Sequence, residues 1–160
     1  MQQQADNFRA LKILHLALLA GLTMLALVSL LMRFTGTMGD SPAEESLSRI
    51  LQVVAAVLST GMLLLGFNLF RKKILEARNS PEPAQKRMEL YRAACITWWA
   101  MIEGPGLFAI IGFILTGNYS FFALGFFHIV ILAVFMPRKE NIIMLLNLST
   151  KEVDELSGQA

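Results

Sequence analysis

The sequence predicts an all-α integral membrane protein: a four-helix bundle of membrane spans, followed by a short cytoplasmic carboxyl-terminal helix. Hydrophobic residues make up 55% of the 160 residues and charged residues only 16%, whereas soluble globular domains carry roughly 25% charged residues. The mean hydropathy of the chain is +0.55. This composition leaves no room for a large soluble domain.

Four apolar segments are each long enough to cross the hydrocarbon core of a bilayer, which takes about 20 residues. The segments are 13–32, 50–70, 93–116 and 119–136. The first is longer than the roughly 7–15 residues of a signal-peptide core, so we expect it to be retained as a span. Together the four segments form a transmembrane domain over residues 1–137.

The distribution of basic residues predicts the orientation of the spans. Lys and Arg in short loops remain on the cytoplasmic side. Twelve of the fourteen Lys and Arg residues fall before the first span, within 71–92 or in the tail 138–160, and only Arg33 and Arg49 fall between the first two spans. We therefore expect both termini and the middle loop to lie in the cytoplasm. The protein itself is expected to be integral to the cytoplasmic (inner) membrane.

Capping patterns and turn residues predict the ends of the helices. Ser41-Pro42-Ala43-Glu44 is typical of a helix start, with a capping hydroxyl, a proline at the first helical position and an acidic residue at the third. Prolines at 81 and 83 separate the second and third helices. Gly117-Asn118 leaves room only for a tight turn, so the third and fourth helices should be antiparallel neighbours.

The tail 138–160 is predicted to be amphipathic and to carry one short helix. Ser149 and Glu152 form a capping-box pattern that predicts a helix from Thr150 to about Leu156. The apolar residues of 141–148 suit docking on the membrane face or on a partner.

Glu103 is the carboxylate that lies deepest in a predicted span. It follows Arg92 by 11 residues, or roughly 16 Å along a helix. An ionised carboxylate at that depth costs about 2.5–3.5 kcal/mol, so the side chain should be protonated, paired, or facing water or an ion. We expect it to bind a proton or a cation; the alternative is a protonated glutamic acid that bonds a neighbouring helix or a loosened carbonyl.

His128 reaches almost the same depth from the cytoplasmic side on the fourth segment. A contact between Glu103 and His128 would satisfy both groups and leave one proton to share. Equal depth does not define rotation about either helix axis, so a histidine bonded to a backbone carbonyl is the alternative. His15 lies close to Lys12, and we expect a structural role with its ring near water or headgroups.

Four further residues are expected to support Glu103. Trp99 lies one turn before it on the same face and could donate its indole N–H, although simple packing is the alternative. Pro105 removes a helix hydrogen bond and, with Gly104 and Gly106, predicts a kink. Ala100 and Gly104 form a small-residue face for helix contact.

Residues 77–115 resemble the second half of a rotary ATP synthase c-subunit, the proteolipid, over about a quarter of the chain. The similarity lies in the turn Ala77-Arg78-Asn79-Ser80-Pro81 and in the helix segment that runs from Ile102 to Ile111 around Glu103. The chain departs from the family in its longer loop, in the absence of a dense glycine series, and in its two additional spans. The resemblance implies that Glu103 matches the carboxylate that binds a proton or sodium ion.

Three functions are compatible with these features. The first is proton or cation handling at Glu103, the second a non-enzymatic accessory or scaffold subunit, and the third an enzyme acting on a lipid or quinone near Glu103 and the tryptophans. Two histidines and one cysteine show no metal-ligand spacing, so we expect no cofactor, and an enzyme is the least favoured class. The expected partners are membrane lipids, and copies of the chain or other membrane subunits. No feature indicates nucleic acid binding.

Overall fold

The computed structural model describes residues 2–37 and 45–157, and this part of the chain is all helical, without a strand. The prediction of an all-α protein is confirmed. The helices are α1 (Gln2–Phe34), α2 (Glu45–Asn79), α3 (Ala84–Thr116), α4 (Tyr119–Val134), α5 (Lys139–Leu146) and α6 (Thr150–Ser157). The helix start predicted at Ser41–Glu44 lies outside the described residues.

Three helices, α1, α2 and α3, are long and apolar enough to cross a membrane. The fourth predicted span is shorter as a helix, because the 16 residues of α4 extend only about 24 Å. It passes the same test only together with α5, from which it is bent by 73°. Pro137 lies between the two helices and has no N–H to continue α4. The chain therefore has three candidate spans, or four if the bent pair is counted as one.

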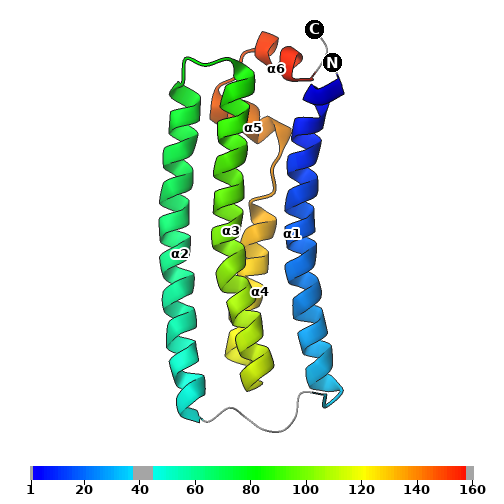
Figure 1. Ribbon diagram of the computed structural model, residues 1–160, viewed down its shortest axis with the longest axis vertical. Helices are drawn as coiled ribbons and strands as arrows, with labels where there is room; N and C mark the ends of the chain where they lie inside the picture. The colour runs from blue at the N-terminus through cyan, green and yellow to red at the C-terminus, as the bar shows by residue number, and fades with distance from the viewer. Residues whose placement is uncertain (1, 38–44, 158–160) are drawn as a thin grey trace.

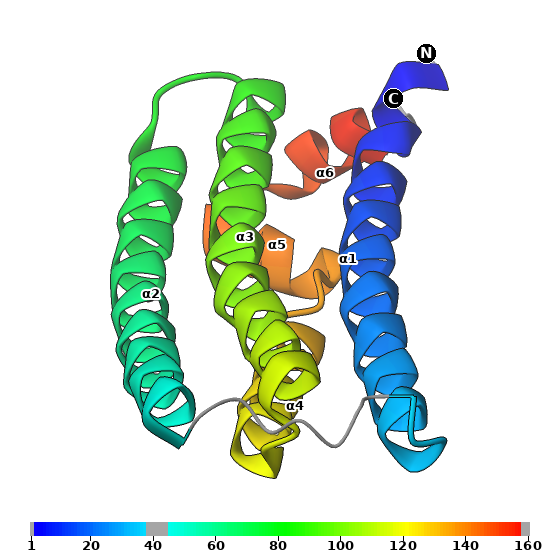
Figure 2. The same cartoon turned by 60° about the horizontal axis from the view of Figure 1, so that its bottom comes forward.

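The helices alternate in direction, and α1 and α2 lie on opposite sides of the α3–α4 pair (Figures 1 and 2). The turn between α3 and α4 is as tight as predicted. Gly117 adopts a φ of 65° and its N–H bonds the carbonyl of Phe113, while the side chain of Asn118 accepts from the N–H of Ser120 at 2.9 Å. The two helices are antiparallel neighbours.

Small residues allow the helices to approach closely. A Cβ atom placed on Gly66 of α2 would lie 2.8 Å from the ring of Trp98 on α3, and one on Gly112 of α3 would lie 2.7 Å from the ring of Phe121 on α4. Large apolar side chains of α1 and α2 face outward, among them Met24, Leu31, Val57 and Leu64, each more than 60% exposed. Such surfaces suit contact with lipid.

The tail packs against the helices of its own chain. Its four buried apolar residues, Ile142, Leu146, Leu148 and Leu156, share a core cluster with side chains of α1, α2 and α3. The bend after α4 turns α5 across the end of the molecule, where α6 also lies (Figure 1). Ile142, Leu146 and Leu148 are thus covered by the same chain and face no external surface, whereas Met144 is 70% exposed. Docking of the tail on the membrane face or on a partner stays a prediction.

Arg87 joins the tail to the end of α3. Its buried guanidinium donates to the carbonyl of Ala77 at 3.2 Å, to the carbonyl of Leu146 and to the carboxylate of Glu152 at 3.0 Å. Glu152 also accepts from the N–H of Ser149 at 2.7 Å, and its own N–H donates in return to the hydroxyl oxygen of Ser149 at 3.4 Å. The predicted capping box of α6 is confirmed.

Candidate functional site

Glu103 is half-buried near the middle of α3 and lies on an outward face of the helix. Thirteen residues separate it from Thr116 at the far end of α3, or about 20 Å of helix. Ala100 and Gly104, its neighbours on that face, are both exposed, and a Cβ atom on Gly104 would meet no atom within 4 Å. The predicted small-residue face is thus uncovered in this chain.

No hydrogen bond or ion pair joins Glu103 to another residue of the described part of the chain. Neither the expected contact with His128 nor a bond from the indole of Trp99 forms. The described residues thus provide no group that would neutralise this carboxylate.

His128 points toward α2 instead of Glu103. Its ring is fully buried, and its Nε2 atom lies 2.7 Å from the hydroxyl of Ser59. The Nδ1 atom has no hydrogen-bond partner among the residues that the structure describes. His128 therefore connects α4 with α2 through Ser59.

Gly106 marks the point where three helices meet. A Cβ atom on this residue would lie 3.0 Å from the Cβ of His128 on α4 and 3.1 Å from a methyl carbon of Leu22 on α1. Its position three residues after Glu103 places His128 about one turn from the carboxylate along α3. Glu103 and His128 therefore lie at nearly the same level along the helices, but their side chains point in different directions.

His15 is also fully buried and lies against Trp99, with ring centroids 4.7 Å apart. The expectation that His15 reaches water or headgroups is wrong, because α1 turns this side chain toward α3. Neither ring nitrogen has a hydrogen-bond partner within the described residues. Trp99, one turn before Glu103, belongs to this contact between α1 and α3.

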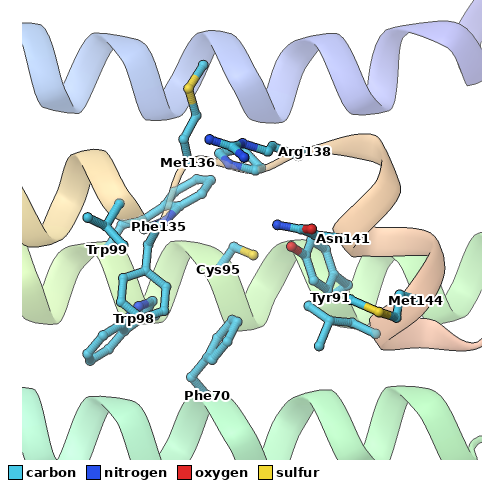
Figure 3. Close-up of a pocket in the computed structure, with 13 residues that line it drawn as sticks. Phe70, Tyr91, Cys95, Trp98, Trp99, Phe135, Met136, Arg138, Asn141 and Met144 are labelled. Carbon is cyan, nitrogen blue, oxygen red and sulfur yellow. The ribbon is translucent and has the colours of Figure 1, made fainter.

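A cavity of about 360 Å³ opens where α4 bends into α5. Phe70, Trp98 and Phe135 line one side, Tyr91, Asn141 and Met144 the other, and Cys95 lies between them (Figure 3). The lining is mainly aromatic and apolar. Trp98 and Trp99 belong to it but Glu103 does not, so the cavity offers an apolar ligand no contact with that carboxylate.

Pro105 lies inside α3, which continues as one helix on both sides of it. The kink expected at Gly104-Pro105-Gly106 stays a prediction. No cluster of three or more His, Cys, Asp or Glu side chains that could hold a metal ion occurs in 2–37 or 45–157.

The arrangement defines a class rather than an individual protein: an all-helical chain with three or four apolar helices able to cross a membrane. No protein-family model, curated protein or solved structure matches the chain.

Proposed function

We propose that the chain is an integral membrane protein of four spans, with both termini in the cytoplasm, in which Glu103 binds and releases a proton or a cation. The three long helices and the bent α4–α5 pair support the spans. The concentration of basic residues at the ends of the chain and within 71–92 supports the orientation.

The observation that carries the proposal is the lack of a protein partner for Glu103 near the middle of α3, within the described residues. An ionised carboxylate at that depth costs about 2.5–3.5 kcal/mol. Since no side chain of the described residues compensates its charge, a proton, a cation or a neighbouring molecule must do so. The resemblance of 77–115 to the proteolipid would assign Glu103 the same role.

In this proposal His128 has a structural role, although its depth alone suggests a contact with Glu103. Its bond to Ser59 positions α4 against α2 and leaves Glu103 accessible on the outer face of α3. A direct relay between the two side chains is therefore not part of the mechanism.

Proton flux into proteoliposomes tests the role of Glu103. Glu103→Gln, which keeps the size of the side chain and removes its titration, should lower the flux at least tenfold. Glu76→Gln is the matched control, because Glu76 is exposed on α2, and it should leave the flux unchanged. Equal flux from wild-type protein and Glu103→Gln would contradict the proposal.

Labelling with a hydrophobic carbodiimide distinguishes a proton from a metal cation, because this reagent attacks protonated carboxyl groups in apolar surroundings. Glu103 should be the modified residue in mass spectra. Protection by sodium ions indicates a cation site, whereas labelling that sodium ions do not affect indicates a proton site.

A second candidate function, an accessory subunit of a membrane complex, is favoured by the uncovered face around Ala100 and Gly104. Small residues let helices approach closely in a bilayer, and a partner helix there would also cover Glu103. In a Cys95→Ser background, Ala100→Cys should form covalent dimers or adducts with a partner in native membranes. Leu64→Cys, exposed on α2, should not. If neither variant cross-links above the background, the accessory function is excluded for this face.

A further inference from the structure

We propose that a basic cavity between the start of α1 and the start of α5 binds the phosphate headgroup of an anionic phospholipid. The cavity has a volume of about 490 Å³. Arg9 and Lys12 line it from α1, and Arg138, Lys139 and Glu140 line it from the other end of the chain. The site is separate from Glu103 and shares with the proposed function only the location of the chain in a membrane.

Basic side chains outnumber acidic ones among the residues that line this cavity. The lining contains four basic side chains and one acidic side chain. Lys139 already has an interaction of its own, so the side chains left to bind an anion are those of Arg9, Lys12 and Arg138. None of these three forms an ion pair with a described residue. Like charges that converge on one concave surface repel one another, and a bound anion removes that repulsion.

Retention of basic residues on the cytoplasmic side does not explain this arrangement by itself. That rule requires basic residues near the ends of spans, in any direction. Here side chains from the two ends of the chain converge on a single cavity, because the start of α1 and the tail lie at the same end of the molecule (Figure 1). Basic pockets between helices at this membrane surface are typical sites for lipid headgroups.

The surroundings of the cavity favour a phospholipid over a soluble phosphate. Lys12 is followed on α1 by Ile13 and Leu16, which are 57% and 42% exposed and can contact acyl chains. The aromatic cavity of about 360 Å³ (Figure 3) adjoins the basic one, since Met136, Pro137 and Arg138 line both. A headgroup in the basic cavity thus leaves its acyl chains beside apolar surface.

The chemistry of the lining side chains suits a phosphodiester. Two guanidinium groups can each donate two parallel hydrogen bonds to phosphate oxygens, and an ammonium group adds a point charge. A zwitterionic headgroup would bring its own cation into a cavity that already has an excess of positive charge. The cavity should therefore select phosphatidylglycerol over phosphatidylcholine.

Native mass spectrometry of the full chain in neutral detergent tests the proposal. We expect the wild-type protein to bind phosphatidylglycerol at least tenfold more tightly than phosphatidylcholine. The variant Arg9→Gln/Lys12→Gln/Arg138→Gln should lose this preference. The control Lys72→Gln/Arg78→Gln/Arg92→Gln removes the same charge from exposed positions of α2 and α3 and should keep it.

Other results would overturn the assignment. Equal binding of the two lipids would show that the cavity does not select an anionic headgroup. An equal loss in both triple variants would show that binding depends only on the overall charge of the protein. Displacement of the lipid by inorganic phosphate at the same concentration would identify a soluble anion as the ligand. If the triple variant does not fold, Arg138→Lys serves instead, because it keeps the charge but loses the bidentate hydrogen bonds to phosphate. An unchanged affinity of this variant for phosphatidylglycerol would contradict the proposal. Glu103→Gln should bind phosphatidylglycerol normally, so failure of the proton-flux test leaves this test unaffected.

Discussion

The hydrogen bond between His128 and Ser59 is a buried polar contact between two apolar helices, α4 and α2. His128 is fully buried, Ser59 is 4% exposed, and 2.7 Å separate Nε2 from the hydroxyl oxygen. Hydrogen bonds between membrane helices contribute about 0.6 kcal/mol on average and up to about 1.7 kcal/mol. The contact thus serves to set the rotation of α4 relative to α2 as much as to stabilise the fold.

Substitution should change the free energy of unfolding much more at one of the two glycines that flank Pro105 than at the other. Gly106→Val should lower the free energy of unfolding by about 1–3 kcal/mol, since even a Cβ atom there lies 3.0 Å from His128 and 3.1 Å from Leu22. Gly104→Val should change it by less than about 0.5 kcal/mol, as expected at an exposed position. Unfolding of both variants in mixed detergent micelles measures the difference.

Gly104→Val is also the internal control, because both substitutions add the same side chain to the same helix two residues apart. Similar stability of the two variants would mean that α1, α3 and α4 do not approach as closely at Gly106 as the structure shows.

At the scale of the elements, α6 depends on a carboxylate that has partners in two helices. Glu152 caps its own helix through Ser149 and bonds Arg87 of α3. The N–H and hydroxyl of Ser149, followed by the nearby Arg87, hold the pKa of Glu152 below its ordinary value of 4.5. Its charged form is therefore favoured in the folded tail.

The attachment of α6 should weaken in acid for this reason. A carboxylate with a lowered pKa stabilises the fold above its unfolded pKa, and this contribution is lost as the pH falls through the lower folded value. Amide hydrogen exchange of α6, corrected for intrinsic rates, should therefore accelerate below about pH 4.5. Glu152→Gln should exchange faster already at neutral pH and show little further change.

Asp154→Asn provides the comparison for this experiment, since Asp154 is exposed on the same helix. It should retain the acid dependence of the wild-type protein. A wild-type tail whose exchange does not depend on pH between 3 and 7 would show that Glu152 does not hold α6.

At the scale of the whole molecule, the start of α1, the tail helix α6 and the α2–α3 connection all lie at one end of the structure (Figure 2). Most of the basic residues lie in these segments. The opposite end carries Arg33, in the last turn of α1, and Arg49, near the start of α2. This separation of charge is the basis for the proposed orientation.

Labelling of single cysteines in intact cells tests the orientation. In a Cys95→Ser background, a membrane-impermeant maleimide should label Ser46→Cys from outside and Gln85→Cys only after lysis. Both positions are exposed at helix ends, so the membrane alone should account for the difference. Labelling of Gln85→Cys before lysis would reverse or exclude the proposed topology.

Local patterns in the sequence predicted most of the helices correctly, because each depends on neighbouring residues. The apolar segments, the glycine turn at Gly117 and the capping box at Ser149 all act within a few residues of themselves. The length of α4 was overestimated by two residues, because the unbroken apolar run continues to Met136 whereas the helix ends at Val134.

The sequence by itself determined an apolar, helical chain and the positions of its few polar groups along the apolar helices. Only the tertiary structure decided which way those groups point: Ser59 rather than Glu103 meets His128, His15 meets Trp99, and Glu103 is left without a partner among the described residues. It also brought Arg9 and Arg138 to one cavity. Depth follows from counting residues along one helix, whereas direction depends on how several helices rotate and pack against one another.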